Sequence, residues 1–282
     1  MAEEHRNRAS GWKHAKLSGH NNEECVKILL DTDRRYCADF MRRIGYGSET
    51  VRSTSIGGLH ETNVPGVVGK KTKSKTDLKL FCDSGRVINI SIKKSVGGQV
   101  YFVRAGLFIQ VFEAQFNKRI PEDVKRAISL FWAAADDAVD IIEKYADRSD
   151  AKSYALQLRH RSVNATTLRA YDVSLYDALK VWFADHIYEL TKLSFTMGAA
   201  ADEAEWSEFV WYINLLGENN VDAVFHIEDI CNAAAAAADR ETYYGDSHGG
   251  TTIQLPFGFV QWHQAQLQFH HSYDKICSLL GV

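Results

Sequence analysis

Residues whose side chains can together hydrolyse a phosphodiester lie close to one another between Lys70 and Tyr101. Asp77 opens one apolar run, and Ser91 and Lys93 lie at the end of the next. The intervening Asp83-Ser84-Gly85 is a hairpin signal, so the two runs are predicted to be neighbouring antiparallel strands. A carboxylate at the start of one strand and a lysine at the end of the next can then meet at one metal ion and one water.

Side-chain alternation predicts which residues share a face of the second strand. One face is predicted to carry Val87, Asn89, Ser91 and Lys93. The other face is predicted to carry Ile88, Ile90, Ile92 and Lys94. The isoleucine face is expected to pack on a core, which leaves the polar face directed toward Asp77. Lys93 is therefore preferred over Lys94 as the lysine of the site, because it shares a face with Ser91.

The rest of the chain supplies elements that must position this hairpin. Residues 1–20 are predicted to be loop and residues 21–44 to be one or two helices. The pattern further predicts strands at 77–82, 86–94, 99–104, 251–255 and 259–269, and helices at 107–118, 121–145, 175–197, 204–216, 221–238 and 272–280. The predicted fold class is α/β (α+β), a core sheet flanked by helices with a large helical insertion. We expect one domain over 1–282, with a catalytic core at about 10–118 plus 245–282, where the carboxy-terminal strands return, and a helical part at about 119–244.

Composition limits the class of protein. A chain of 282 residues that is 45% hydrophobic can bury a sizeable core, and 24% charged residues is not typical of a disordered chain. The net charge of -3 means that any nucleic-acid surface must come from local clusters of Lys and Arg. The five cysteines form no CxxC pair, which favours a reducing cytoplasm, and neither a signal peptide nor a membrane span is expected.

Asp77 followed by Ser91-Ile92-Lys93 resembles the motif of the PD-(D/E)XK nuclease superfamily. Gly97-Gly98-Gln99 follows it, as in many type II restriction endonucleases. Ser91 replaces the second acid of the motif; Msp-type enzymes carry Asn-x-Lys there, also behind a Lys-Thr-Asp opening, which Lys75-Thr76-Asp77 matches. The resemblance covers roughly a tenth of the chain. It implies a restriction-endonuclease-like core and a Mg²⁺-dependent, sequence-specific endodeoxyribonuclease for which Mn²⁺ can substitute.

The resemblance also implies roles for individual residues. Asp77 would bind Mg²⁺ through carboxylate oxygen, the ligand that hard cations prefer. Lys93 would stabilise developing negative charge or position the nucleophile, and Ser91 would orient a metal-bound water. A second acid must come from elsewhere, and in this superfamily a helical glutamate often supplies it. Glu24 is assigned to the metal here, with its neighbour Glu23 as the alternative.

Candidate DNA contacts lie on both sides of this motif and near the carboxy terminus. Lysines directly before Asp77 form a basic patch that can neutralise phosphates. Glutamine amides read adenine edges bidentately, and histidine can donate to guanine. The candidate DNA-binding residues are Lys70, Lys71, Lys73, Lys75, Gln99, Gln264, Gln266 and His270. In the final run Trp262, Gln264, Gln266 and Gln268 are predicted on one face of a strand, and His263, Ala265, Leu267 and Phe269 on the other.

Several alternatives stay open. The expected partner is double-stranded DNA, cut by one chain or by a symmetric homodimer, with a cognate DNA methyltransferase in the same system. A nuclease of the same superfamily that serves repair or a mobile element would carry the same motif. Because Ser91 replaces an acid, a DNA-binding protein without catalysis is a further alternative. A helical interaction protein with a chance match is the remaining one.

Overall fold

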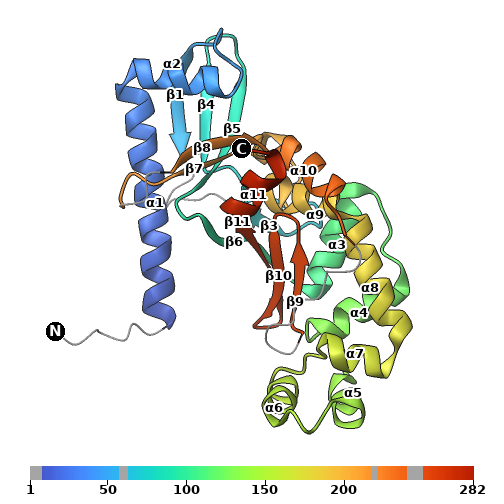
Figure 1. The fold of residues 1–282 in the computed structure, drawn as a ribbon. Helices are drawn as coiled ribbons and strands as arrows, with labels where there is room; N and C mark the ends of the chain where they lie inside the picture. Colours follow the sequence, from blue (N-terminus) through green and yellow to red (C-terminus); the bar gives the residue numbers. More distant parts are fainter. Residues whose placement is uncertain (1–7, 57–62, 218–220, 240–249) are drawn as a thin grey trace, which may run out of the picture. The chain divides into compact units, whose positions relative to one another are not determined.

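The computed structural model describes residues 8–56, 63–217, 221–239 and 250–282, with side chains from residue 19 onward. The chain folds into two compact units. Of the described residues, unit 1 comprises 8–56, 63–66, 71–96, 196–217 and 221–227, and unit 2 comprises 67–70, 97–195, 228–239 and 250–282. Figure 1 shows the helices and strands of both units. The fold class is mixed α/β, as predicted, and no helix in the described part of the chain is long and apolar enough to cross a membrane.

Unit 1 is built on a mixed five-stranded sheet in the order β1-β4-β5-β7-β8. The strands are β1 (Val51–Ile56), β4 (Leu78–Cys82), β5 (Val87–Lys93), β7 (Phe209–Ile213) and β8 (Asp222–His226). β4 and β5 are antiparallel and pair Leu78 with Ile90, as the hairpin signal predicted. β7 joins the other side of β5 in parallel, and β8 closes that edge antiparallel to β7. The short pair β2 (Asn63–Pro65) and β3 (Lys71–Lys73) lies apart from this sheet.

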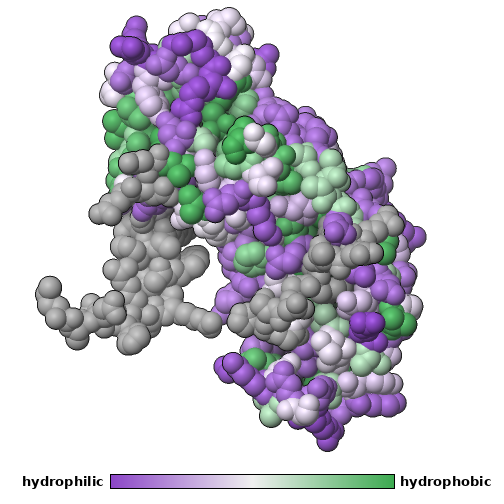
Figure 2. All heavy atoms as spheres, in the orientation of Figure 1, coloured by the Kyte–Doolittle hydropathy of each residue, from purple (hydrophilic) through white to green (hydrophobic). Residues whose placement is uncertain are grey.

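Two helices precede the sheet of unit 1. Helix α1 (Arg8–Thr32) begins within the segment that was expected to be loop, and α2 (Arg34–Arg43) follows after the N-cap Asp33. The Asp33 carboxylate accepts a hydrogen bond from the Tyr36 N–H and so satisfies one of the open donors at the start of α2. The exposed face of α2 is rich in arginine, and the surface around it is mostly hydrophilic in Figure 2.

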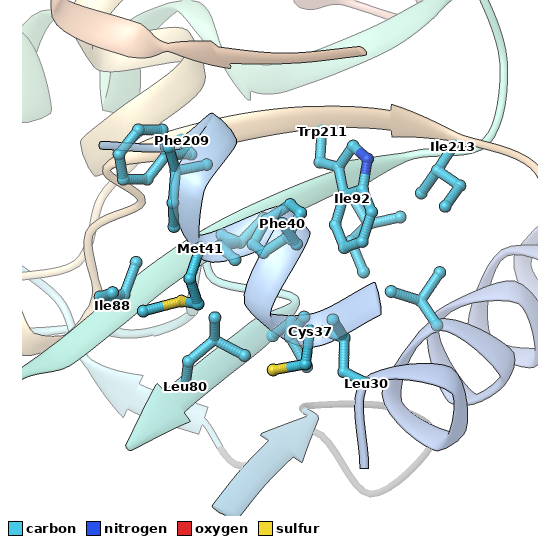
Figure 3. Packing of buried hydrophobic residues seen from close by; sticks show 14 of the residues in the cluster. Leu30, Cys37, Phe40, Met41, Leu80, Ile88, Ile92, Phe209, Trp211 and Ile213 are labelled. Carbon is cyan, nitrogen blue, oxygen red and sulfur yellow. The ribbon is translucent and has the colours of Figure 1, made fainter. Parts of the chain in front are cut away.

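The opposite face of α2 forms the core of unit 1 with one face of the sheet. Figure 3 shows Phe40 and Met41 of α2 directed toward the strands. The Phe40 and Trp211 rings lie 4.1 Å apart between centroids. Ile88, Ile90 and Ile92 are at most 6% exposed and belong to the same cluster, which confirms the predicted alternation along β5. Each fully buried isoleucine stabilises the fold by about 1.5–3 kcal/mol. A shift of one residue would expose all three, so the isoleucine face fixes the register of β5.

Unit 2 holds a separate antiparallel sheet in the order β6-β11-β10-β9. Its strands are β6 (Gly97–Arg104), β9 (Thr252–Leu255), β10 (Gly258–His263) and β11 (Gln266–Ser272). Helices pack against one face, where the ring centroids of Phe108 and Phe269 are 6.0 Å apart. The helices of this unit are α3 (Ala105–Phe116), α4 (Glu122–Phe131), α5 (Ala138–Tyr145), α6 (Ala151–His160), α7 (Ala165–Tyr171), α8 (Val173–Asp185), α9 (Ile187–Lys192), α10 (Ile227–Ala236) and α11 (Tyr273–Leu280). The first residue of α10, Ile227, belongs to unit 1. A π-helical turn, Leu193–Met197, follows α9.

Several sequence-based expectations about elements are wrong. The segment 204–216 contains strand β7 and no α-helix, and 221–238 begins with strand β8 before α10. The helix expected over 121–145 is interrupted between α4 and α5, where Ala133 adopts a positive φ of 58°. The strand expected over 259–269 is a hairpin whose turn residues, Gln264 and Ala265, both have positive φ. β6 and the carboxy-terminal strands pair with one another and do not return to the sheet that carries Asp77.

Candidate active site

Asp77 is fixed at the entry to β4 by the hairpin register. Its backbone N–H donates to the Ile90 carbonyl at 2.9 Å, which holds the residue opposite the end of β5. One carboxylate oxygen, Oδ2, accepts the Ile92 N–H at 2.7 Å and the Ser91 hydroxyl at 3.0 Å. The side chain is 27% exposed. The carboxylate is therefore oriented by the strand it faces while remaining accessible to solvent.

Lys93 and Ser91 complete the group. The Lys93 Nζ donates to Ser91 Oγ at 2.7 Å and to the Ile92 carbonyl at 3.3 Å. It lies 3.6 Å from Asp77 Oδ2, with the lysine side chain 17% exposed. Ser91 is 1% exposed and bridges the two charged groups. The structure thus brings together the three residues that the sequence singled out as catalytic, and their catalytic role stays a prediction.

An acid from α1 lies within electrostatic reach of Asp77, and it is Glu23 rather than Glu24. Burial, followed by repulsion from Asp77, raises the pKa of Glu23 to about 7, while His20 and Lys93 oppose the shift. Nδ1 of His20 lies 3.1 Å from Oε2 of Glu23. Glu24 is exposed. Successive residues of a helix point about 100° apart, so only one of the two glutamates can face the sheet.

Asn22 explains why α1 presents Glu23 at this place. Its side chain is fully buried, and its amide nitrogen donates to the Ile213 carbonyl at 2.9 Å. Its amide oxygen accepts the Leu215 N–H at 2.8 Å. These two hydrogen bonds tie the helix to the end of β7, the strand beside β5. The sequence signal for this contact was present in the His20-to-Glu24 segment, but the sequence alone did not distinguish the two glutamates.

The predicted basic patch divides into two kinds of lysine. Lys70, Lys71 and Lys73 are exposed, with Lys71 and Lys73 in β3. Lys75 is partly buried instead, and its pKa is lowered to about 7, first by desolvation and then by the positive charge of Lys93, with Asp77 opposing the shift. Lys75 therefore belongs to the electrostatic environment of Asp77 and Lys93, a role that its place in the basic run of the sequence does not indicate.

The remaining candidate DNA contacts lie in unit 2. Gln99 is on β6, and Gln266 and His270 are on β11. Gln264 is in the turn between β10 and β11, so the expectation that it shares a strand face with Gln266 is wrong. Leu267 and Phe269 are fully buried, which confirms the core face predicted for that part of the run.

The donor set of the site fits a hard divalent cation only in part. No group of three or more His, Cys, Asp or Glu side chains suited to a metal occurs among the described residues. Asp77 and Glu23 nevertheless offer two carboxylates close enough for the charge of one to raise the pKa of the other. Mg²⁺ needs only one or two protein carboxylates, because it retains several waters and also takes ligands from substrate phosphates. These two acids would hold it.

Comparisons with known proteins add a structural match. No protein-family model matches the chain, and no curated protein matches its sequence. Among solved structures, the chain is similar to a crystal structure of the restriction endonuclease MspI in complex with its cognate DNA, with a TM-score of 0.48 and 11% identity. The match covers 92% of this chain and 87% of that chain. A TM-score below 0.5 is too low for the likeness to support a fold or a function, so the fold class rests on the strands and helices described above.

Proposed function

We propose that this protein is a Mg²⁺-dependent endodeoxyribonuclease that cleaves double-stranded DNA at specific sequences, as type II restriction enzymes do. The observation that carries the proposal is the arrangement of Asp77, Ser91 and Lys93, with the lysine amine 3.6 Å from the carboxylate across one hairpin. Their order and spacing match the motif resemblance described for the sequence. Glu23 supplies a second carboxylate beside them.

Hydrolysis of a phosphodiester requires that a water oxygen form one bond to phosphorus while one phosphorus–oxygen bond of the backbone breaks. A divalent cation, when bound, lowers the pKa of a water and neutralises phosphate charge. Asp77 and Glu23 would hold that cation. The Lys93 ammonium, held by Ser91 Oγ and the Ile92 carbonyl, is placed to stabilise the negative charge that develops on the phosphate oxygens.

Ser91 has a positioning role in this proposal. Its hydroxyl donates to Asp77 and accepts from Lys93, so it orients both charged groups without adding a charge of its own. A neutral residue at this position makes the site depend more strongly on Glu23 for metal affinity. The exposed lysines of β3 lie in the same unit as Asp77 and are suited to neutralise phosphates of the bound duplex.

Digestion of a plasmid of known sequence, followed by mapping of the ends, tests the proposal. Wild-type protein with Mg²⁺ is expected to give discrete fragments whose ends share one sequence, and Asp77→Ala is expected to leave the plasmid intact. Glu24→Ala is a matched control on α1, because Glu24 is exposed, and it should cut like the wild type. Intact plasmid with both Mg²⁺ and Mn²⁺, or cutting by Asp77→Ala at the wild-type rate, contradicts the proposal.

A DNA-binding protein without catalysis is the second candidate, and two observations favour it. The described residues hold no group of three metal-binding side chains, and the position of the second acid is a serine. This candidate predicts duplex binding with no cleavage under any divalent metal. Cleavage that requires a lesion, an end or a junction would instead identify a repair or mobile-element nuclease. The number of chains that act together, a cognate methyltransferase and a cytoplasmic location stay predictions.

A further inference from the structure

One face of the sheet in unit 2 carries a row of amide side chains. Gln261 Nε2 on β10 donates to Gln268 Oε1 on β11 at 3.0 Å, and Gln268 Nε2 donates to Gln99 Oε1 on β6. Gln261 Nε2 also lies 3.2 Å from Nε2 of His270. We call Gln99, Gln261, Gln268 and His270 the amide row. Direct contacts between these side chains show that they share one face across three adjacent strands.

The two faces of this sheet differ in chemistry. Val260, Leu267 and Phe269 point to the helix-covered side and are fully buried. On the other side, Phe102 is 51% exposed, and Phe259 stacks on the His270 ring with centroids 4.5 Å apart. The amide row therefore lies on a surface with aromatic rings close by, which suits contact with flat heterocycles as well as with hydrogen-bonding edges.

The four strands of this sheet carry no carboxylate and one arginine. β6, β9, β10 and β11 hold five glutamines and three histidines but no Asp or Glu, although the chain as a whole carries 36 acidic residues. Arg104, exposed at the end of β6, pairs in register with Gln266. Strands without carboxylates bring no repulsion of their own against phosphates, and their amides can donate and accept hydrogen bonds.

We infer that the amide row reads base edges of duplex DNA, with a preference for adenine. This inference rests on the proposed function only in taking DNA as the ligand. Glutamine pairs bidentately with the N6 and N7 groups of adenine in the major groove. An amide has two donor hydrogens and two acceptor lone pairs, so Gln268, which uses one of each within the row, retains capacity for a base. Hydrogen bonds along the row hold the amides in place before DNA arrives, which reduces the entropy lost on binding.

The dimensions of the row agree with this role. Neighbouring strands lie about 4.8 Å apart, so amides on three adjacent strands span about 10 Å. The major groove is about 12 Å wide, and base steps repeat about every 3.4 Å along each strand. The row therefore fits within the groove and covers about three successive base pairs. Shortening one amide is expected to relax the preference at one or two adjacent positions while the rest of the motif remains.

Selection from a random duplex library tests the inference without cleavage. Wild-type protein in EDTA is used to enrich bound duplexes, and the enriched motif is compared with those of Gln99→Ala and Gln268→Ala. Gln99 is exposed, so its truncation should leave the fold intact, which a thermal melt verifies. Gln110→Ala, an exposed glutamine on α3 of the same unit, is the matched control.

The wild type and Gln110→Ala are expected to enrich the same adenine-containing motif. Each variant of the amide row is expected to lose about tenfold of the adenine preference at one or two adjacent positions. No enriched motif with the wild type, or an identical motif from all four proteins, overturns the inference. Plasmid cleavage is scored separately in Mg²⁺. If the motif changes in the variants of the amide row but wild-type protein leaves the plasmid uncut, only the proposed function is refuted. If those variants cut the plasmid at the same sites as the wild type, only this inference is refuted.

Discussion

Replacing Ser91 with aspartate restores the acid that the nuclease motif carries at this position, and the structure predicts opposite effects on stability and on metal binding. Ser91 is 1% exposed and its Oγ lies 3.0 Å from Asp77 Oδ2, so a new carboxylate would face Asp77 at about 4 Å. At an effective dielectric constant of about 20, that repulsion costs about 4 kcal/mol. The Lys93 amine, 2.7 Å from the Ser91 oxygen, offsets this repulsion, but a carboxylate at this buried position also loses its hydration, so a net cost of about 2–3 kcal/mol remains.

Thermal melts with and without Mg²⁺ measure both effects. A loss of about 2–3 kcal/mol corresponds to a melting temperature about 3–5 °C lower for a chain of this size. Mg²⁺ at a hundred times its dissociation constant should restore about 2.7 kcal/mol. Ser91→Asn is the matched control, because it has nearly the same shape without the charge; it keeps only Asp77 and Glu23 as acids and should gain less from Mg²⁺ than Ser91→Asp. If Ser91→Asp melts like Ser91→Asn and neither responds to Mg²⁺, the placement of a metal beside Asp77 is refuted.

Further predictions concern Glu23, Asp222 and Phe40. The pKa of Glu23 is raised to about 7, so its protonation stabilises the fold fully below about pH 4.5, and this contribution is lost as the pH rises to about 7. Without metal, Glu23→Gln should therefore be more stable than wild type above pH 7. Denaturant titrations at several pH values measure this difference. Mg²⁺ affinity, measured calorimetrically, should rise with pH through about 7 in the wild type and show a weaker rise in Glu23→Gln, because the metal competes with the proton. Desolvation raises the pKa of Asp222, but hydrogen bonds from Arg43, Trp211 and Tyr36 outweigh it and lower the pKa. The stability that Asp222 contributes is therefore present above about pH 4 and is lost as the pH falls below that value. Asp222→Asn should reduce this loss of stability in acid. Phe40→Ala removes a fully buried ring that packs at a tilt against Trp211 and should cost about 3–5 kcal/mol in urea unfolding. Ala38→Ser changes an exposed residue on the same helix and should cost less than about 0.5 kcal/mol.

The site could be predicted from sequence where its geometry is local. Asp77, Ser91 and Lys93 belong to one hairpin, and alternation along β5 is enough to place Lys93 on the face of Ser91. The choice between Glu23 and Glu24 depends instead on how α1 is rotated against the sheet. That rotation is set by hydrogen bonds from Asn22 to residues almost 200 positions later, and no local pattern reveals them.

Some strands and their pairing could also not be predicted from local sequence patterns. β7 has five buried residues in succession, so it lacks the alternation that marks a half-buried strand. Its aromatic and β-branched composition was the available signal for a strand. The turn between β10 and β11 uses Gln264 and Ala265 in positive φ, in place of the glycine or asparagine that favours such turns. The pairing of β6 with β11 joins segments more than 160 residues apart, which sequence patterns do not encode.

Single-turnover cleavage of one plasmid by wild type, Asp77→Ala and Lys93→Met is the most direct test of a hydrolytic site on the β4–β5 hairpin. With protein in excess and Mg²⁺ present, wild type should convert supercoiled plasmid to linear fragments, and both variants should react at least about a thousandfold more slowly while melting within a few degrees of wild type. Cleavage by either folded variant within tenfold of the wild-type rate would contradict the assignment of catalysis to these two side chains.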